Sequence, residues 1–207
     1  MIKKAPPVIK RSAFLPIASP RFVKEPPTGP DSLHEVKFDG FRLQAHKLGA
    51  EVRLFSKAGK DLTNRFPAIA AAVARIPATA AAVDGELVAC DATDRPDFYS
   101  LLRRAKDGLC VWAFDLLHLN GEDLRGRPLI VRKRLLSDLL AGDVIRYAAH
   151  FDDGEKLLQA AADMRLEGIV SKRRMAAYKA GSRCGWLKVK TAEWRAANRE
   201  RHKLFEK

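Results

Sequence analysis

The chain has 207 residues, of which 47% are hydrophobic and 30% charged, so it can bury one substantial core and is not a disordered polymer. Its formal net charge of +13 is concentrated at the ends, because residues 1–30 carry +5, residues 31–170 carry −1 and residues 171–207 carry +9. Basic ends on a nearly neutral body favour a polyanionic partner such as DNA or RNA, although a solvated basic surface explains the charge alone equally well.

The cysteines and the apolar segments exclude further classes of protein. Cys90, Cys110 and Cys184 form no C-x-x-C pair, so neither a zinc site nor a disulfide framework is expected, and a reducing compartment fits them. The most apolar stretch, 68–83, contains an arginine and a proline and is not expected to span a bilayer. The N-terminus lacks the apolar run of a secretory signal. We therefore expect a cytoplasmic protein with no membrane partner.

The predicted elements begin with an arm, because residues 1–30 contain seven prolines and favour an extended segment over a helix. Alternation of apolar and polar residues then predicts strands. These strands are expected over 33–38, 41–47 and 51–55. Asn64 is expected to cap a helix that runs to Pro77.

The second half of the chain continues the mixture of strands and helices. Strands are expected over 83–90 (interrupted at Asp84-Gly85-Glu86), 110–117, 168–172 and 186–190. Helices are expected over 98–103, 131–140 and 155–164, the second with its leucines on the inner face. Strands outnumber helices and short turns favour antiparallel pairing, so the predicted class is α+β.

Charged residues fall on several strands that are predicted to be half buried. Glu35, Lys37 and Asp39 alternate and therefore point to one side of their strand. Taken singly, such a segment is most often a surface ion pair, and Asp39-Gly40 is an ordinary hairpin turn signal. Buried charges cost free energy unless they are paired or bound to a ligand. Carboxylates and ammonium groups together are what a magnesium-triphosphate pocket needs.

Five motifs in order make a specific resemblance. They are K-x-D-G-x-R (37–42), D-G-E-L-V (84–88), F-D-L-L (114–117), E-G-I-V-S-K (167–172) and W-L-K-V-K (186–190). The series resembles the covalent nucleotidyltransferase superfamily of DNA ligases, RNA ligases and mRNA capping enzymes. The segment 54–67 looks most like the ligase module of bacterial end-joining enzymes. The resemblance implies two antiparallel sheets with flanking helices around a nucleotide cleft, the ATP-grasp-like adenylation fold.

The resemblance also implies a role for each matching residue. Lys37 would form a covalent lysyl-AMP from ATP with Mg²⁺ or Mn²⁺, and AMP would pass to a DNA 5′-phosphate for strand joining in repair. The binding residues would be Glu35 (base pocket), Arg42 (ribose or 5′-phosphate), Glu86 and Glu167 (ribose or metal), Phe114 (adenine stacking), and Lys172, Lys188 and Lys190 (phosphates). Without the resemblance, Phe114 is expected to be a core-packing residue, and Lys188 and Lys190 are expected to be solvated. Trp112, Trp186 and Trp194 are expected in the core or an interface.

The sequence departs from the family pattern in two places. Lys57 stands where such ligases often carry arginine, and only seventeen residues follow Lys190, so we expect no OB-fold domain there. We expect a Pro-rich basic arm (1–30), an adenylation domain (31–190) and a basic tail (191–207). As a hypothesis, the arm and the tail replace part of the missing domain as electrostatic clamps.

The expected partner is nicked or broken double-stranded DNA, with an end-joining factor or an OB fold supplied in trans as further candidates. One alternative is a catalytically weak nucleotide- or DNA-end-binding module that acts with a partner. RNA ligation or capping is a second alternative.

Overall fold

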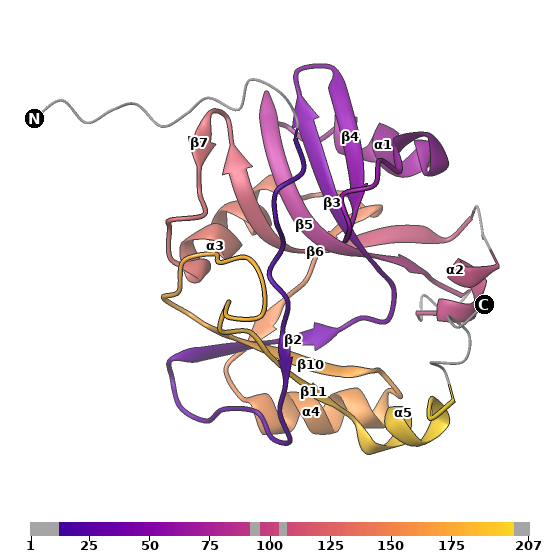
Figure 1. Cartoon of the computed structure of the whole chain (residues 1–207), viewed down its shortest axis with the longest axis vertical. Coiled ribbons are helices and arrows are strands. Elements are labelled where there is room, and N and C mark those ends of the chain that lie inside the picture. Colours follow the sequence, from indigo (N-terminus) through magenta and orange to yellow (C-terminus); the bar gives the residue numbers. More distant parts are fainter. Residues whose placement is uncertain (1–12, 92–95, 104–106, 201–207) are drawn as a thin grey trace, which may run out of the picture.

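Two β-sheets face each other in the computed structural model, which describes residues 13–91, 96–103 and 107–200 (Figure 1). The six-stranded sheet has the order β4-β3-β5-β6-β7, with β8 paired to β6. Its strands are β3 (Phe41–Leu48), β4 (Glu51–Ser56), β5 (Ala80–Ala89), β6 (Leu109–Leu119), β7 (Glu122–Asp123) and β8 (Ile145–Tyr147). The five-stranded sheet, in the order β1-β11-β10-β2-β9, contains β1 (Arg21–Phe22), β2 (Ser32–Lys37), β9 (His150–Phe151), β10 (Gly168–Arg173) and β11 (Leu187–Lys190). Pairing is antiparallel except between β1 and β11 and between β6 and β8.

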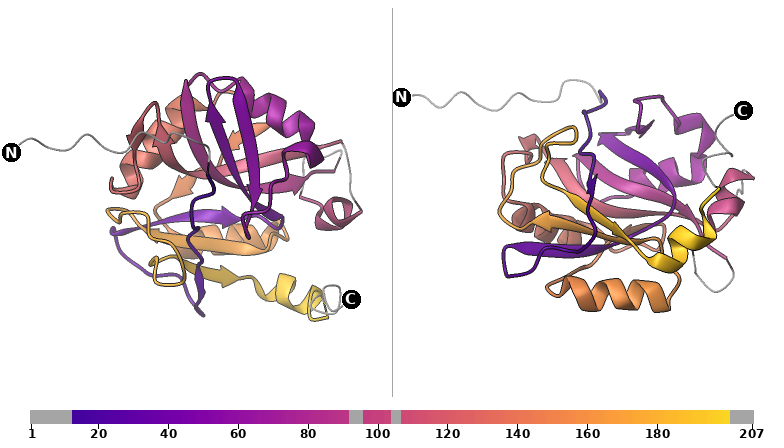
Figure 2. Two further views of the ribbon diagram at one scale, coloured as in Figure 1. Left: turned by 45° about the horizontal axis from the view of Figure 1, so that its top comes forward. Right: turned by 60° about the horizontal axis from the view of Figure 1, so that its bottom comes forward.

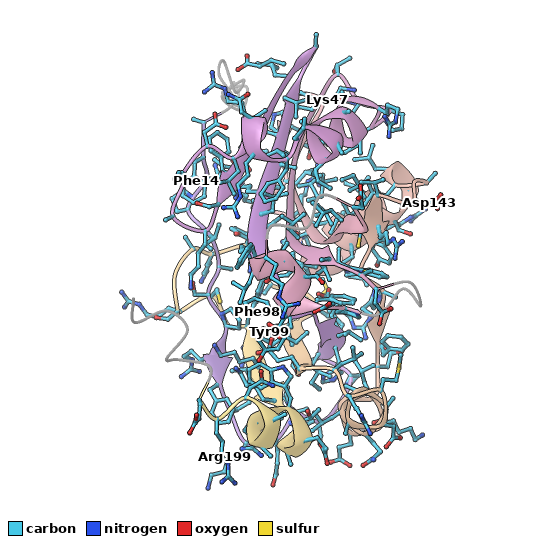
Figure 3. The ribbon with its side chains drawn as sticks, turned by 90° about the vertical axis from the view of Figure 1, so that its right-hand side faces the viewer. Phe14, Lys47, Phe98, Tyr99, Asp143 and Arg199 are labelled. Atoms are coloured by element: carbon cyan, nitrogen blue, oxygen red, sulfur yellow. The ribbon has the colours of Figure 1, made fainter. Side chains whose placement is uncertain are left out.

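Helices pack against both sheets, and Figure 2 shows one helix lying along the five-stranded sheet on the side away from the six-stranded sheet. The helices are η1 (Thr63–Arg65), α1 (Pro67–Ala74), α2 (Phe98–Leu102), α3 (Leu129–Leu139), α4 (Gly154–Asp163) and α5 (Ala192–Ala197). The main core joins α1 and α3 to the six-stranded sheet, and a second cluster joins α4 to the five-stranded sheet. A third cluster that includes Leu117 and Trp186 lies between the sheets. On α2, Phe98 packs edge-on against Phe41 while Tyr99 is exposed (Figure 3).

Several sequence predictions need correction. Asn64 caps no helix, because it lies within η1 and α1 begins at Pro67 with Phe66 as its N-cap residue. The strand β5 is not interrupted at Asp84-Gly85-Glu86, since it pairs throughout and accommodates the segment by shifts of register against β6. The α+β class is confirmed. In the described part of the chain, no helix combines the length and apolarity that a membrane crossing requires.

The segment 38–40 does not fold a hairpin, because β2 and β3 belong to different sheets. It carries the chain from one sheet to the other directly after Lys37. A glycine is required at residue 40 because the backbone of β5 lies close to it: a Cβ there would lie 2.2 Å from the carbonyl oxygen of Leu87. The absence of a side chain at this residue lets β3 start beside β5.

Gly40→Ala should therefore destabilise the protein by about 1–3 kcal/mol, the cost of forcing an extra carbon into a packed interior. The matched control is Gly126→Ala, because nothing lies within 4 Å of a Cβ at Gly126. Urea denaturation of both variants measures the difference. Equal midpoints for the two variants would contradict the steric role of Gly40.

Residues 15–23, here called the strap, run across both sheets (Figure 1). Leu15 exchanges two hydrogen bonds with the side-chain amide of Gln44 on β3, at 2.8 and 3.1 Å. The backbone N–H of Ala18 donates to the hydroxyl of Tyr178 at 2.9 Å, and the N–H of Val23 donates to the carbonyl of Lys188 at 3.0 Å. The first part of the predicted arm, 1–12, and the end of the predicted tail, 201–207, lie outside the described residues.

His46 is buried beneath the strap, and burial lowers its pKa to about 4. Its Nε2 lies 2.8 Å from the side-chain oxygen of Gln44, which also accepts a hydrogen bond from the backbone N–H of Leu15. The unfolded chain binds this proton near pH 6.5, so the stabilising contribution is complete above that pH and decreases as pH falls towards 4.

We expect the titration of His46 to lower the free energy of unfolding by about 3 kcal/mol as the pH falls from 6.5 to 4, because a change of one unit in pKa is worth about 1.4 kcal/mol. Urea melts at pH 7.5 and pH 4 measure the change. His46→Gln, which keeps an N–H donor without a titrating ring, should show a shallower pH dependence. An unchanged slope in that variant would exclude His46 as the source.

Candidate active site

A pocket opens between the two sheets at the end of β2. Its lining residues are Pro20, Glu35, Val36, Lys37, Phe38, Arg42, Glu86, Phe114, Val170, Lys172 and Trp186. A second pocket adjoins it and is lined by residues that include Lys57, Lys60, Arg65 and Lys188. Pro20, Lys37, Arg42 and Glu86 line both pockets. The first pocket, here called the aromatic pocket, contains the rings of Phe114 and Trp186 beside several charged side chains. The second, here called the basic pocket, is rich in lysine and arginine, and Lys37 lines both.

Lys37 is the last residue of β2, and its ammonium group is held by a carboxylate. Its Nζ donates to Oε2 of Glu167 at 2.7 Å, while Nζ of Lys190 lies 2.9 Å from Oε1 of the same side chain. Antiparallel pairing produces this contact, because Gly168 on β10 is the register partner of both Lys37 and Lys190. Gly168 has a φ of 152° and its Cα faces the Val189 carbonyl, so a side chain there would collide with β11.

Glu86 approaches Lys37 from the opposite sheet. Cross-strand register places Glu86 between Arg42 on β3 and Trp112 on β6. Burial raises the pKa of Glu86 to about 7, while the charges of Lys37 and Arg42 oppose that increase. The carboxylates of Glu86 and Glu167 thus lie near the same ammonium group. They are the residues in the site that could hold a divalent cation.

Arg42 is fixed by a bidentate ion pair with Asp84, at 2.6 and 2.7 Å. The Tyr178 hydroxyl donates to the same carboxylate at 2.8 Å, so the pair is held from the strap side as well. The guanidinium carbon of Arg42 lies 4.4 Å from the centroid of the Phe114 ring. Phe114 also contacts Trp186 edge-on, at a centroid distance of 5.9 Å. The predicted stacking residue therefore lines the pocket with a cation over its ring.

Glu35 lies in the wall of the aromatic pocket and is 2% exposed. Two lysines hold its carboxylate: Lys172 from β10 at 2.5 Å and Lys133 from α3 at 2.8 Å. The Nζ of Lys172 also lies 4.1 Å from the centroid of the Trp186 ring. Burial opposes ionisation of Glu35, but the charges of Lys133 and Lys172 outweigh it and lower the pKa of this carboxyl group. Burial also lowers the pKa of Lys172.

In the basic pocket, several ammonium groups lie around Lys37. Burial lowers the pKa of Lys188, and the neighbouring charges of Lys37 and Lys190 lower it further. Lys57 and Lys60 are exposed at the rim. Repulsion among these cations is relieved by an anion, so the pocket is suited to phosphate groups.

The nine site residues predicted from the motifs come together in this region. Six line the aromatic pocket, Lys188 lines the basic pocket, and Glu167 and Lys190 contact Lys37 or its partner carboxylate. Sequence reasoning missed Asp84, Tyr178 and Lys133 as supporting residues and Trp186 as a pocket residue. Helical spacing could have found Lys133, because it lies four residues after Leu129 and three before Leu136 on the inner face of α3.

Comparison with known proteins assigns the family. Residues 22–190 match the ATP-dependent DNA ligase domain. The chain belongs to this family. The ligase domain is 36% identical over 176 residues to the multifunctional non-homologous end joining protein LigD of Pseudomonas aeruginosa, covering 81% of this chain and 21% of that protein. It is 36% identical over 197 residues to a probable DNA ligase of Beutenbergia cavernae, covering 89% of this chain and 38% of that protein.

A solved structure shares the fold. The mycobacterial DNA ligase D complexed with ATP and MES superposes with a TM-score of 0.71 at 29% identity, covering 83% of this chain and 60% of that chain. The adenylation fold expected from the motifs is therefore confirmed. The ligase domain spans between about a fifth and two fifths of the length of these two curated relatives.

Proposed function

We propose that this chain is the adenylate-forming part of an ATP-dependent DNA ligase. Neutral Lys37 Nζ attacks the α-phosphorus of ATP, a P–N bond forms, and the P–O bond to the β-phosphate breaks to release pyrophosphate. An oxygen of a DNA 5′-phosphate then displaces the lysine, and the 3′-hydroxyl of the adjoining strand displaces AMP. The activity would serve DNA repair and recombination.

The observation that supports this proposal best is the place of Lys37 between an aromatic and a basic pocket. Adenine would lie in the aromatic pocket, beside Phe114 and Trp186, and the phosphates would lie among Lys188 and its neighbours. The α-phosphorus would then lie at the junction, within reach of Lys37. Glu167 holds the nucleophile by a 2.7 Å hydrogen bond and would orient its attack.

The divalent metal is part of the proposal. Among the described residues, no group of three or more His, Cys, Asp or Glu side chains is placed to hold an ion. Glu86 and Glu167 fit Mg²⁺ or Mn²⁺ nevertheless, since Mg²⁺ usually takes one or two carboxylates and completes its shell with water and substrate phosphates. When bound, the metal would offset negative charge on the phosphates.

The substrate and the partners are proposed from the same resemblance. Nicked or broken double-stranded DNA fits the basic ends of the chain, and contacts of this kind weaken as salt increases. The relatives favour a ligase over a catalytically weak binding module, because they are named DNA ligases and LigD. An end-joining factor or an OB fold in trans would complete duplex capture. We propose a cytoplasmic location in a bacterium, at the nucleoid when bound to DNA.

The test is incubation of the protein with ATP and Mg²⁺ followed by intact mass measurement. One AMP adduct per chain supports the proposal if the adduct is stable in alkali and is cleaved by acid, as a phosphoramide bond is. Nicked DNA added afterwards should discharge the adduct. A protein that stays unmodified with ATP and Mg²⁺ and with ATP and Mn²⁺, in the absence of DNA, would overturn the proposal.

A further inference from the structure

Three buried charges behind the aromatic pocket bring residues from both halves of the fold together. Glu35 comes from the five-stranded sheet, while Lys133 comes from α3, which packs on β6 of the other sheet. Lys133 is 0% exposed and is absent from the pocket lining. Its Nζ is fixed, because it donates to the Ala148 carbonyl at 2.5 Å and lies 4.3 Å from the centroid of the Tyr147 ring.

The wall of the pocket presents an acceptor beside a donor. The Glu35 carboxylate accepts, and the Lys172 ammonium 2.5 Å away donates. A 6-aminopurine offers the matching edge, since its exocyclic amine donates and its N1 accepts. A 6-oxopurine offers the reverse, with an acceptor at position 6 and a donor at N1. Sites built around such hydrogen bonds discriminate strongly, because the wrong base leaves buried polar groups unpaired.

We propose that Lys133 is a positioning residue that fixes the Glu35 carboxylate so that the pocket selects a 6-aminopurine over a 6-oxopurine. The inference rests on the proposed function in taking this pocket as the nucleotide site. Lys133 draws Oε1 of Glu35 to a distance of 2.8 Å, and Lys172 draws Oε2 in another direction. Rotation of the carboxylate is thereby restricted. Each oxygen of a carboxylate carries two lone pairs, so Glu35 can accept from a base while both lysines stay bound to it.

Packing alone does not account for a lysine at this position. Lys133 shares the inner face of α3 with Leu129 and Leu136, where an apolar side chain would fill the space without desolvating a charge. Apolar replacements of buried ion pairs are often neutral or stabilising. Lys172 already neutralises Glu35, so Lys133 adds an excess cation to the buried cluster. Its specific contribution is the direction of the Glu35 carboxylate.

The experiment compares ATP with inosine triphosphate as donors for labelling Lys37, in single turnover at subsaturating nucleotide. The ratio of the second-order rate constant for ATP to that for inosine triphosphate should fall at least about ten-fold in Lys133→Met. A change of this size corresponds to the loss of about one hydrogen bond that distinguishes the two bases. Lys133→Arg, which keeps the charge, should retain most of the ratio. Arg134→Met is the matched control, because Arg134 is the neighbouring residue on α3 and its side chain is 85% exposed. A general loss of stability lowers both rates together and leaves the ratio unchanged.

An unchanged ratio in a folded Lys133→Met would overturn the inference. If that variant does not fold, Lys133→Gln, which keeps a donor for the Ala148 carbonyl, carries the same comparison. Calorimetric binding of AMP against IMP separates this inference from the proposed function. A wild type that prefers AMP but forms no lysyl-nucleotide contradicts only the proposed function. A wild type that labels equally well with both triphosphates contradicts only the inference.

Discussion

Lys37→Arg should abolish formation of the covalent AMP adduct, lowering its rate by at least about four orders of magnitude, the effect that removal of a catalytic nucleophile has. Arginine keeps the positive charge and can still pair with Glu167, but its guanidinium does not deprotonate in proteins and cannot attack phosphorus. The loss should therefore occur in the chemical step, while nucleotide binding stays within a few-fold of wild type. Mass measurement of the adduct and calorimetry of ATP binding are the two readouts.

The control for this prediction is Lys156→Arg, because the Lys156 side chain is 87% exposed on α4, away from the pocket. It should form the adduct at the rate of the wild type. If Lys37→Arg still accepted one AMP per chain, another residue would be the nucleophile. Peptide mapping of that adduct would then show which one.

Asp115→Ala is expected to have the largest effect on stability, about 3–5 kcal/mol, because it leaves a buried charge without its partner. Asp115 and Arg132 are 0% and 1% exposed, and the guanidinium binds both carboxylate oxygens, at 2.7 and 2.9 Å. Arg132 also donates to the carbonyls of Arg127 and Ala176, so it ties α3 to β6 and to the segment before Tyr178. For a chain of this size, the loss corresponds to a fall in Tm of about 10 °C.

Calorimetric melting measures this loss. Asp138→Ala, which removes one member of an exposed pair with Arg134 on the same helix, should leave the Tm unchanged within error. The double variant Asp115→Leu/Arg132→Leu should recover part of the stability, because no charge remains buried. A Tm of Asp115→Ala close to that of the wild type would show that water reaches Arg132.

The strands could be predicted because alternation in the sequence reflects which side of a sheet is buried. The segments 33–38, 41–47 and 168–172 agree with β2, β3 and β10 to within a residue at most ends. The failures arise where a distant segment decides the local structure. Asp84 sits inside a continuous strand because Arg42 and Tyr178 satisfy its carboxylate, and neither is near it in the chain.

The site residues that lie within motifs were predicted from the sequence. The residues that support them from outside the motifs were not predicted. Glu35 and Lys37 lie within one motif, so a single strand positions both. Lys133 and Tyr178 belong to no motif, and each acts through a partner separated from it by many residues. Only the folded arrangement of α3 and of the segment that precedes β11 reveals these pairs.

The strap has a practical consequence for where this domain can be cut. The family match begins at residue 22, yet contacts to the six-stranded sheet begin upstream of it, with Phe14 against Phe55 on β4 and Leu15 against Gln44 on β3. A recombinant fragment that starts at residue 22 would lack both hydrogen bonds between Leu15 and Gln44 and leave the Tyr178 hydroxyl without the Ala18 N–H. It would also expose apolar surface between the sheets, where Ala18 is 1% exposed. The folding unit therefore extends upstream of the segment that the family model matches, and a soluble fragment should start before Phe14.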